Sequence, residues 1–147
     1  MSLEDWRIEG RLREHKTSKA EISQLLAVFR RDSLDATVEG LSLDRRFATA
    51  YSAALTICTA ALAASGYRTA GEGHHFVSVQ SLAFTLGLDA PTIEKFNRFR
   101  RKRNIADYER TGMISPQDVA EMLKLANDLR ARFDAWLSKN HPELVDV

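Results

Sequence analysis

The alanine-rich stretch over residues 43–65 constrains the fold most, because it contains neither glycine nor proline and its apolar side chains recur at helical spacing. The larger members of this apolar stripe are Phe47, Tyr51, Leu55, Cys58 and Leu62. Ser42 can cap the start of the helix, and Gly66 can end it. Alanine lets neighbouring helices approach on more than one side, so we expect this to be the central helix of the fold.

Apolar residues at the same spacing and capping residues predict four more helices, over residues 19–39, 74–86, 90–108 and 115–138. The patterns Ser18-x-x-Glu21 and Ser115-x-x-Asp118 mark the start of the first and the last of these helices. Residues 76–79 are also compatible with a strand, but the spacing of the apolar residues favours a helix.

Five helices with short connections and no convincing strand predict an all-α fold, a single-domain up-and-down bundle over residues 18–138. Residues 1–17 are expected to form a charged N-terminal arm, either docked on the bundle or loose. Trp6 and Ile8 are the candidate anchors of this arm. Residues 139–147 are expected to form a C-terminal tail.

The charge balance of the 147-residue chain, 21 Lys and Arg against 20 Asp and Glu, argues against a broad basic coat for duplex DNA. The one cysteine, Cys58, excludes an internal disulfide and is interpreted as a buried thiol. The chain has no second cysteine and no histidine pair at i,i+4 spacing, so we expect no metal and no cofactor. No apolar run approaches the ~18 residues that span a bilayer, and no secretory signal is found, so we expect a cytoplasmic protein without a membrane segment.

The one dense chemical feature is a basic run over residues 95–103, which holds six of the 21 basic residues. On a helix, the face that begins with Ile93 and Phe96 continues with Arg100, Arg103, Asn104, Asp107 and Tyr108. Arg101 lies at the flank of this face. A half-sheltered cleft of this kind suits a phosphate or a nucleotide, because the arginine fork matches phosphate oxygens.

A purely structural interpretation of the same run stays open. Arg103 and Asp107 lie one turn apart and can form an internal ion pair. Asn104 can satisfy a loop carbonyl, and Tyr108 can belong to the core. The residues that project the other way, and that we interpret as a solvated face, are Lys95, Arg98 and Lys102.

The segment Arg103-Asn104-x-x-x-Tyr108, late in a helical bundle, resembles the R-N-x-x-x-H motif of the HEPN superfamily (higher eukaryotes and prokaryotes nucleotide-binding domain). Residues 46–54 and 64–68 resemble the second helix of that family and its exit, and the likeness covers residues 18–138. It implies a homodimer in which the two motif copies face each other across one composite cleft. Many members are metal-independent ribonucleases that act as toxins paired with a nucleotidyltransferase-type antitoxin, or in phage defence.

The resemblance implies that Arg103 contacts a phosphate and that Asn104 orients the site. Tyr108 stands where the catalytic histidine of the family belongs, and a phenol with a reference pKa of ~10 is a poor base at neutral pH. The remaining implied residues are Arg100 and Arg101 for phosphate or RNA binding, and Asp107 and Tyr51 in support.

The histidines lie far from this motif in sequence. His74 and His75 can approach it only through folding, and we interpret them as polar residues at a helix start. The sequence therefore favours a noncatalytic or weakly active dimer that binds RNA or a nucleotide, in a toxin–antitoxin or defence-type system. The alternatives are an active metal-independent ribonuclease toxin and a helical dimerisation scaffold. Tyr108 is also a candidate for nucleotidyl transfer by a partner protein.

Overall fold

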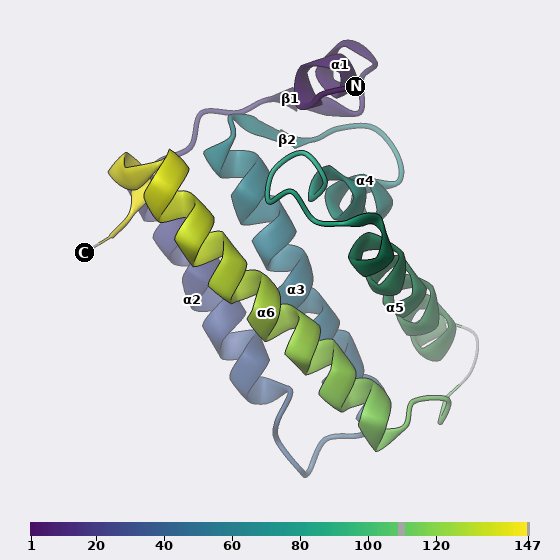
Figure 1. The fold of residues 1–147 in the computed structure, drawn as a ribbon. Coiled ribbons are helices and arrows are strands. Elements are labelled where there is room, and N and C mark those ends of the chain that lie inside the picture. The colour runs from purple at the N-terminus through teal and green to yellow at the C-terminus, as the bar shows by residue number, and fades with distance from the viewer. Residues whose placement is uncertain (109–110, 147) are drawn as a thin grey trace.

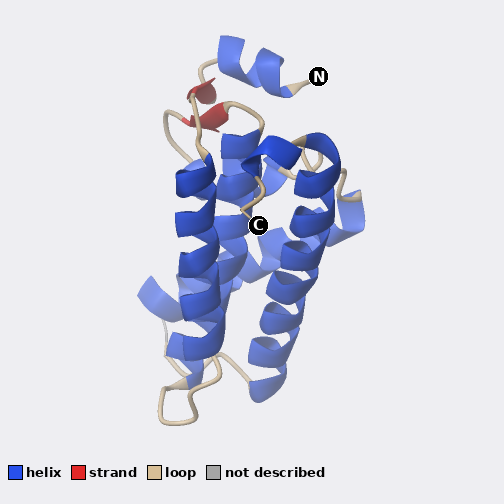
Figure 2. Cartoon of the chain, turned by 90° about the vertical axis from the view of Figure 1, so that its left-hand side faces the viewer, coloured by secondary structure: helices blue, strands red, loops and turns tan. Residues whose placement is uncertain are grey.

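The computed structural model describes the backbone of residues 1–108 and 111–146 and the side chains of residues 1–106 and 111–146. Within these residues the fold is all-α apart from one small two-stranded sheet, which confirms the expected fold class. Three long helices lie side by side in Figures 1 and 2: α2 (Lys19–Asp35), α3 (Leu43–Ala64) and α6 (Pro116–Asn140). A fourth, α5 (Ala90–Tyr108), packs on the other side of α3, so that the long helices alternate in direction along the chain.

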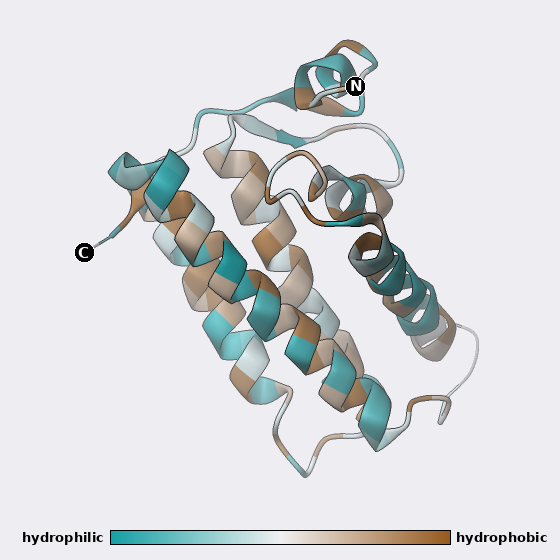
Figure 3. Cartoon of the chain, in the orientation of Figure 1, coloured by the Kyte–Doolittle hydropathy of each residue, from teal (hydrophilic) through white to brown (hydrophobic). Residues whose placement is uncertain are grey.

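The central position of α3 is confirmed. It contacts α2, α6, α5 and the short helix α4 (His74–Ser81), and Figure 3 shows apolar colours along most of its length. Phe47, Tyr51 and Ile57 are buried on different turns, and Ala50 and Ala54 between them are buried as well. Ser42 accepts a hydrogen bond from the backbone of Arg45 at the start of α3, and Gly66 follows its end with φ +95°. Small side chains thus allow four helices to reach one helix axis.

The same helix corrects the expectation that no apolar segment is long enough to span a bilayer. Among the residues that the structure describes, α3 is the one helix long and apolar enough to span a bilayer. However, 67% of its most apolar window is buried inside the bundle. A helix that is apolar all round is also typical of the core of a soluble protein, and the structure is compatible with one.

The N-terminal arm is docked rather than loose. It forms α1 (Leu3–Ile8) and β1 (Leu12–Glu14), and β1 pairs antiparallel with β2 (Tyr67–Thr69), which directly follows α3. Trp6 is buried in a small core of its own with Leu12, Leu62 and Val77, whereas Ile8 is 71% exposed. Trp6 is therefore the anchor of the arm and Ile8 is not. The pair of strands corrects the expectation of a chain without strands.

Two helices end earlier than the sequence pattern predicts. α2 ends at Asp35 instead of residue 39, because Thr37 turns its hydroxyl onto the carbonyl of Leu34 and competes with the helix. α4 ends at Ser81 instead of residue 86, and turns follow up to Gly87, which has φ +67°.

The last helix runs slightly longer than predicted, to Asn140. Its start confirms the capping box: Ser115 accepts from the backbone of Asp118, and the Asp118 carboxylate accepts from the backbone of Ser115. Ser18 also caps α2, but the Glu21 carboxylate accepts from Thr17 and contacts His15 instead of returning to Ser18. The expected tail contains the 3-10 turn η1 (Pro142–Leu144) and packs on the bundle through Leu144 and Val145.

Candidate functional site

Three helices bring a set of polar and aromatic side chains together on one side of the bundle. Tyr51 comes from the middle of α3, His75 and Phe76 from the first turn of α4, and Arg100 and Arg103 from α5. We call these five residues the Tyr51 cluster. The turn into α4 depends on Gly73, whose φ of +72° is a backbone conformation that favours glycine.

Tyr51 forms the buried floor of the cluster. Its side chain is 1% exposed, and its hydroxyl lies 3.2 Å from Nδ1 of His75. The guanidinium carbon of Arg103 lies 5.6 Å from the centre of the tyrosine ring, and Phe96 meets the ring edge-on. Burial raises the pKa of the Tyr51 phenol well above its usual range, although the charges of Arg103 and Arg100 oppose this rise. Tyr51 is therefore a neutral phenol that can donate or accept a hydrogen bond.

His75 is an exposed residue whose ring leans on this floor. Burial of part of the ring lowers its pKa below the usual 6.5, and the positive charges of Arg103, Arg100 and His74 lower it further. The imidazole is therefore neutral at pH 7. The sequence interpretation of His75 as only a polar residue at a helix start is incomplete, because folding places it against Tyr51 and within the field of two arginines.

Arg100 is half-buried and held in place by two neighbours. Its Nε donates to Oδ1 of Asn97 at 3.3 Å, and its guanidinium carbon lies 5.5 Å from the centre of the Phe76 ring. Asn97 is 2% exposed and Phe76 is 41% exposed. No carboxylate among the described residues forms an ion pair with Arg100. Asn97 therefore orients the guanidinium group through Nε, and the charge of the group faces an exposed aromatic ring.

Arg103 and Asn104 lie next to each other at the half-buried end of the same face. Nη1 of Arg103 donates to Oδ1 of Asn104 at 3.5 Å. The side chains of Asp107 and Tyr108 lie outside the described residues, and with them the expected Arg103–Asp107 ion pair and the third motif position.

The other basic residues of the run divide between two environments. Arg101 is exposed and forms an ion pair with Glu94 at 3.0 Å, so the structure engages it away from the Tyr51 cluster. Arg98 is exposed, as expected for a solvated face. Lys102 corrects that expectation, because it is half-buried and its Nζ lies 2.8 Å from the Asp118 carboxylate of α6. α5 thus packs on a second side through Lys102, which the helical projection does not predict.

Sequence reasoning missed three residues of this region: His75 as a partner of Tyr51, Phe76 as the ring under Arg100, and Asn97 as its acceptor. Asn97 could have been found from its place one turn before Arg100. His75 and Phe76 leave no local signal, because only the packing of α4 against α3 and α5 brings them to the cluster.

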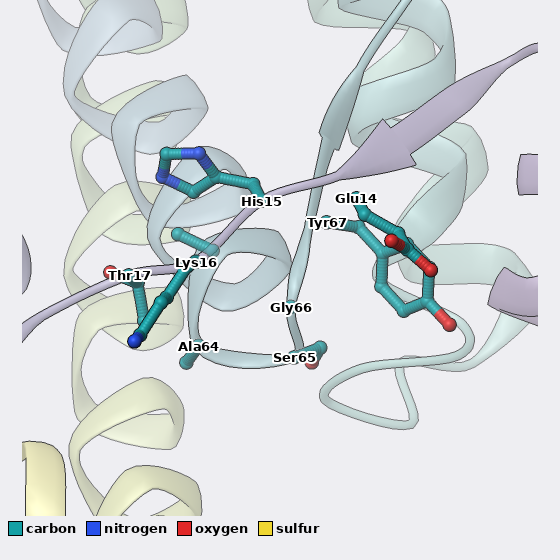
Figure 4. Close-up of a pocket in the computed structure, with 9 residues that line it drawn as sticks. Glu14, His15, Lys16, Thr17, Ala64, Ser65, Gly66 and Tyr67 are labelled. Atoms are coloured by element: carbon teal, nitrogen blue, oxygen red, sulfur yellow. The ribbon is translucent and has the colours of Figure 1, made fainter.

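Hollows of the described surface also occur away from the Tyr51 cluster. One of them, of about 630 Å³, opens between the segment after β1 and the end of α3, and Figure 4 shows the segment from His15 to Thr17 beside the turn at Ser65 and Gly66. There His15 Nε2 and the Thr17 hydroxyl each lie 2.7 Å from the Glu21 carboxylate, and these hydrogen bonds lower the pKa of Glu21. The Tyr51 cluster extends from the buried Tyr51 to the exposed His75 and Phe76.

The described residues contain no group of three or more His, Cys, Asp or Glu side chains that could hold a metal ion. Cys58 is buried in α3, and burial raises its pKa above the usual range, as suits a structural thiol. No protein-family model matches the chain, and no curated protein matches it.

Proposed function

We propose that this chain is a HEPN-like, cytoplasmic protein that binds the phosphates of RNA or of a nucleotide through Arg100 and Arg103. In this proposal it forms a homodimer, and its cleavage activity is absent or weak because Tyr108 occupies the motif position of the histidine. A toxin–antitoxin or defence-type system, with a nucleotidyltransferase-type protein as partner, is the setting that the resemblance implies.

The observation that carries the proposal is the positive field over the Tyr51 cluster. Arg100 and Arg103 lie one turn apart on α5, and the charges of both lower the pKa of His75 on α4. Two guanidinium charges one turn apart favour an anion, and guanidinium groups match phosphate oxygens in charge and shape. The placement of Arg100 by Asn97 reduces the freedom that binding must remove.

Phe76 favours a nucleic acid over a free phosphate ion. Its ring is 41% exposed beside Arg100, and exposed aromatic rings next to cations are typical stacking platforms for unpaired bases. A base on Phe76 and a phosphate on Arg100 would lie within one nucleotide of each other. This arrangement supports single-stranded RNA as the ligand class.

The shape of the site supports a dimer. In a single chain the cluster has two exposed residues, His75 and Phe76, so two chains that face each other would enclose both copies of the site. Twofold symmetry makes such an arrangement self-complementary. Light scattering on a size-exclusion column measures the mass directly, and a monomer at all concentrations would contradict this part of the proposal.

Fluorescence anisotropy with a short fluorescein-labelled single-stranded RNA tests the binding function. Arg100→Gln should weaken binding about tenfold, because it removes a charge-assisted hydrogen bond that contributes ~1.5 kcal/mol or more. The matched control is Arg101→Gln, which removes the same charge one residue away but from the exposed pair with Glu94. Equal affinity in both variants, or no binding by the wild type, would contradict the proposed function.

A further inference from the structure

The strongest unexplained relationship in the molecule is the contact between a buried phenol and a neutral imidazole in a positive field. Tyr51 Oη and His75 Nδ1 lie 3.2 Å apart, and their rings are tilted with centres 5.8 Å apart. A contact through Nδ1 leaves the opposite nitrogen, Nε2, available on an exposed residue. A purely structural pair would need the contact between Tyr51 and His75, but it would not need two arginines beside it.

From this geometry we propose that His75 is the acid–base group of the site, with Tyr51 as the positioning residue that sets which imidazole nitrogen acts as the base. The inference rests on the proposed function, because it needs an RNA phosphate on Arg100 and Arg103. It assigns the chemistry to α4, whereas the sequence motif on α5 carries Tyr108.

The tautomer decides what His75 can do. When Nδ1 carries the proton, it donates to the Tyr51 oxygen, and Nε2 keeps a free lone pair that can accept a proton from a substrate. The groups that face the imidazole are Tyr51 from α3, Arg100 and Arg103 from α5, and His74 from α4. Burial of part of the ring, together with the charges of Arg103 and Arg100, lowers the pKa of His75 and favours the unprotonated imidazole, which is the form that a general base requires.

The ribose 2′-hydroxyl of the RNA is the nucleophile of the cleavage step. Besides the RNA, the step needs only water, which serves as a proton donor. His75 Nε2 takes the proton from a ribose 2′-hydroxyl, and the 2′-oxygen forms a bond to the adjacent phosphorus. The bond from phosphorus to the 5′-oxygen breaks, and that oxygen takes a proton from water; the imidazolium returns its proton to the hydroxide. The products are a 2′,3′-cyclic phosphate and a 5′-hydroxyl end. Arg100 stabilises the charge that develops on the phosphate oxygens.

The residues offer a matched pair for the test. His75→Gln removes the base, whereas His74→Gln removes the neighbouring imidazole, which contacts the Thr69 hydroxyl at 3.0 Å instead of Tyr51. Tyr51→Phe removes only the hydroxyl and keeps the ring beneath Arg103. All four proteins are incubated with fluorescein-labelled single-stranded RNA in EDTA, and the same RNA with 2′-deoxyribose is the uncleavable control.

We expect slow cleavage by the wild type, a cyclic phosphate end, and a rate at least about 100-fold lower in His75→Gln, as is typical for loss of a general base. RNA affinity in that variant should stay within about twofold of the wild type, and His74→Gln should keep both rate and affinity. Tyr51→Phe should lower the rate, and ¹⁵N NMR should show a smaller share of the Nδ1–H tautomer, which a purely structural role would not change.

Equal cleavage by His75→Gln and the wild type would overturn the proposal. RNA binding without any cleavage by the wild type would also overturn it, yet would leave the binding function in place. No RNA binding at all would contradict both. An unchanged tautomer ratio in Tyr51→Phe would overturn the positioning role of Tyr51.

Discussion

The hydroxyl of Tyr51 lies 3.2 Å from Nδ1 of His75, and this contact joins the buried centre of α3 to the exposed first turn of α4. The two residues are 24 positions apart in the chain. Arg103 lies over the ring of the same tyrosine, with its guanidinium carbon 5.6 Å from the centre of the Tyr51 ring. The contact therefore defines where an arginine-bearing face of α5 meets a histidine from another helix.

The pKa of His75 should lie below 6.5 in the folded protein and rise toward that value in Arg100→Gln, because one of the charges that lower it is removed. The unfolded chain binds this proton at a higher pH than the folded chain, so His75 makes stability fall as pH drops from about 6.5 through its folded pKa. NMR titration of the imidazole signals measures both effects. Arg101→Gln is the control, and a pKa of His75 at or above 6.5 would contradict this description of the site.

Trp6→Ala should lower the free energy of unfolding by about 3 kcal/mol, because it empties the small core that the arm shares with Leu62 and Val77. Phe84 meets the Trp6 ring edge-on at 5.1 Å and would lose that contact as well. Ile8→Ala removes an exposed side chain from the same helix and should change stability by less than about 0.5 kcal/mol. Urea denaturation followed by circular dichroism measures both variants, and equal losses would show that the arm is not anchored through Trp6.

Asp118→Asn should destabilise the fold by about 1 kcal/mol at pH 7, since it removes a charged capping residue and the ion pair with Lys102. Burial tends to raise the pKa of Asp118, but hydrogen bonds from Lys102 and Ser115 outweigh it and hold the pKa below its usual 3.8. The charge therefore stabilises the fold above about pH 3.8, and this stabilisation is lost as pH falls through the folded pKa. Wild type and variant should converge at low pH in thermal melts; a constant difference would contradict the charged role.

Local patterns were enough to predict most of the helices. The alanine-rich central helix and the basic helix over residues 90–108 both match the structure, because apolar spacing, capping residues and a following glycine act within a few turns of the chain. The early ends of α2 and α4 depend on weaker turns, such as the Thr37 hydroxyl on Leu34. The strands β1 and β2 have three residues each and stabilise one another only through pairing, so neither leaves a pattern of its own.

The sequence predicted the residues of the candidate site on α5 and Tyr51 on α3, but not those on α4. Arg100 and Arg103 followed from the helical face, whereas His75 and Phe76 reach the cluster through the packing of α4 on α3 and α5. On the opposite side of α5, the helical projection predicted a solvated Lys102. Its contact with Asp118 depends on the packing of α6, which the projection does not include. Helical spacing gives the direction of a side chain but not the partner that it meets.

The salt dependence of RNA binding tests the central claim, phosphate recognition by Arg100, most directly. Anisotropy titrations over a range of salt concentrations give the slope of log Kd against log salt for the wild type, Arg100→Gln and Arg101→Gln. The account predicts that the slope falls by about 0.7 in Arg100→Gln, which corresponds to one phosphate contact with a single strand, and stays unchanged in Arg101→Gln. The same slope in Arg100→Gln as in the wild type would contradict it.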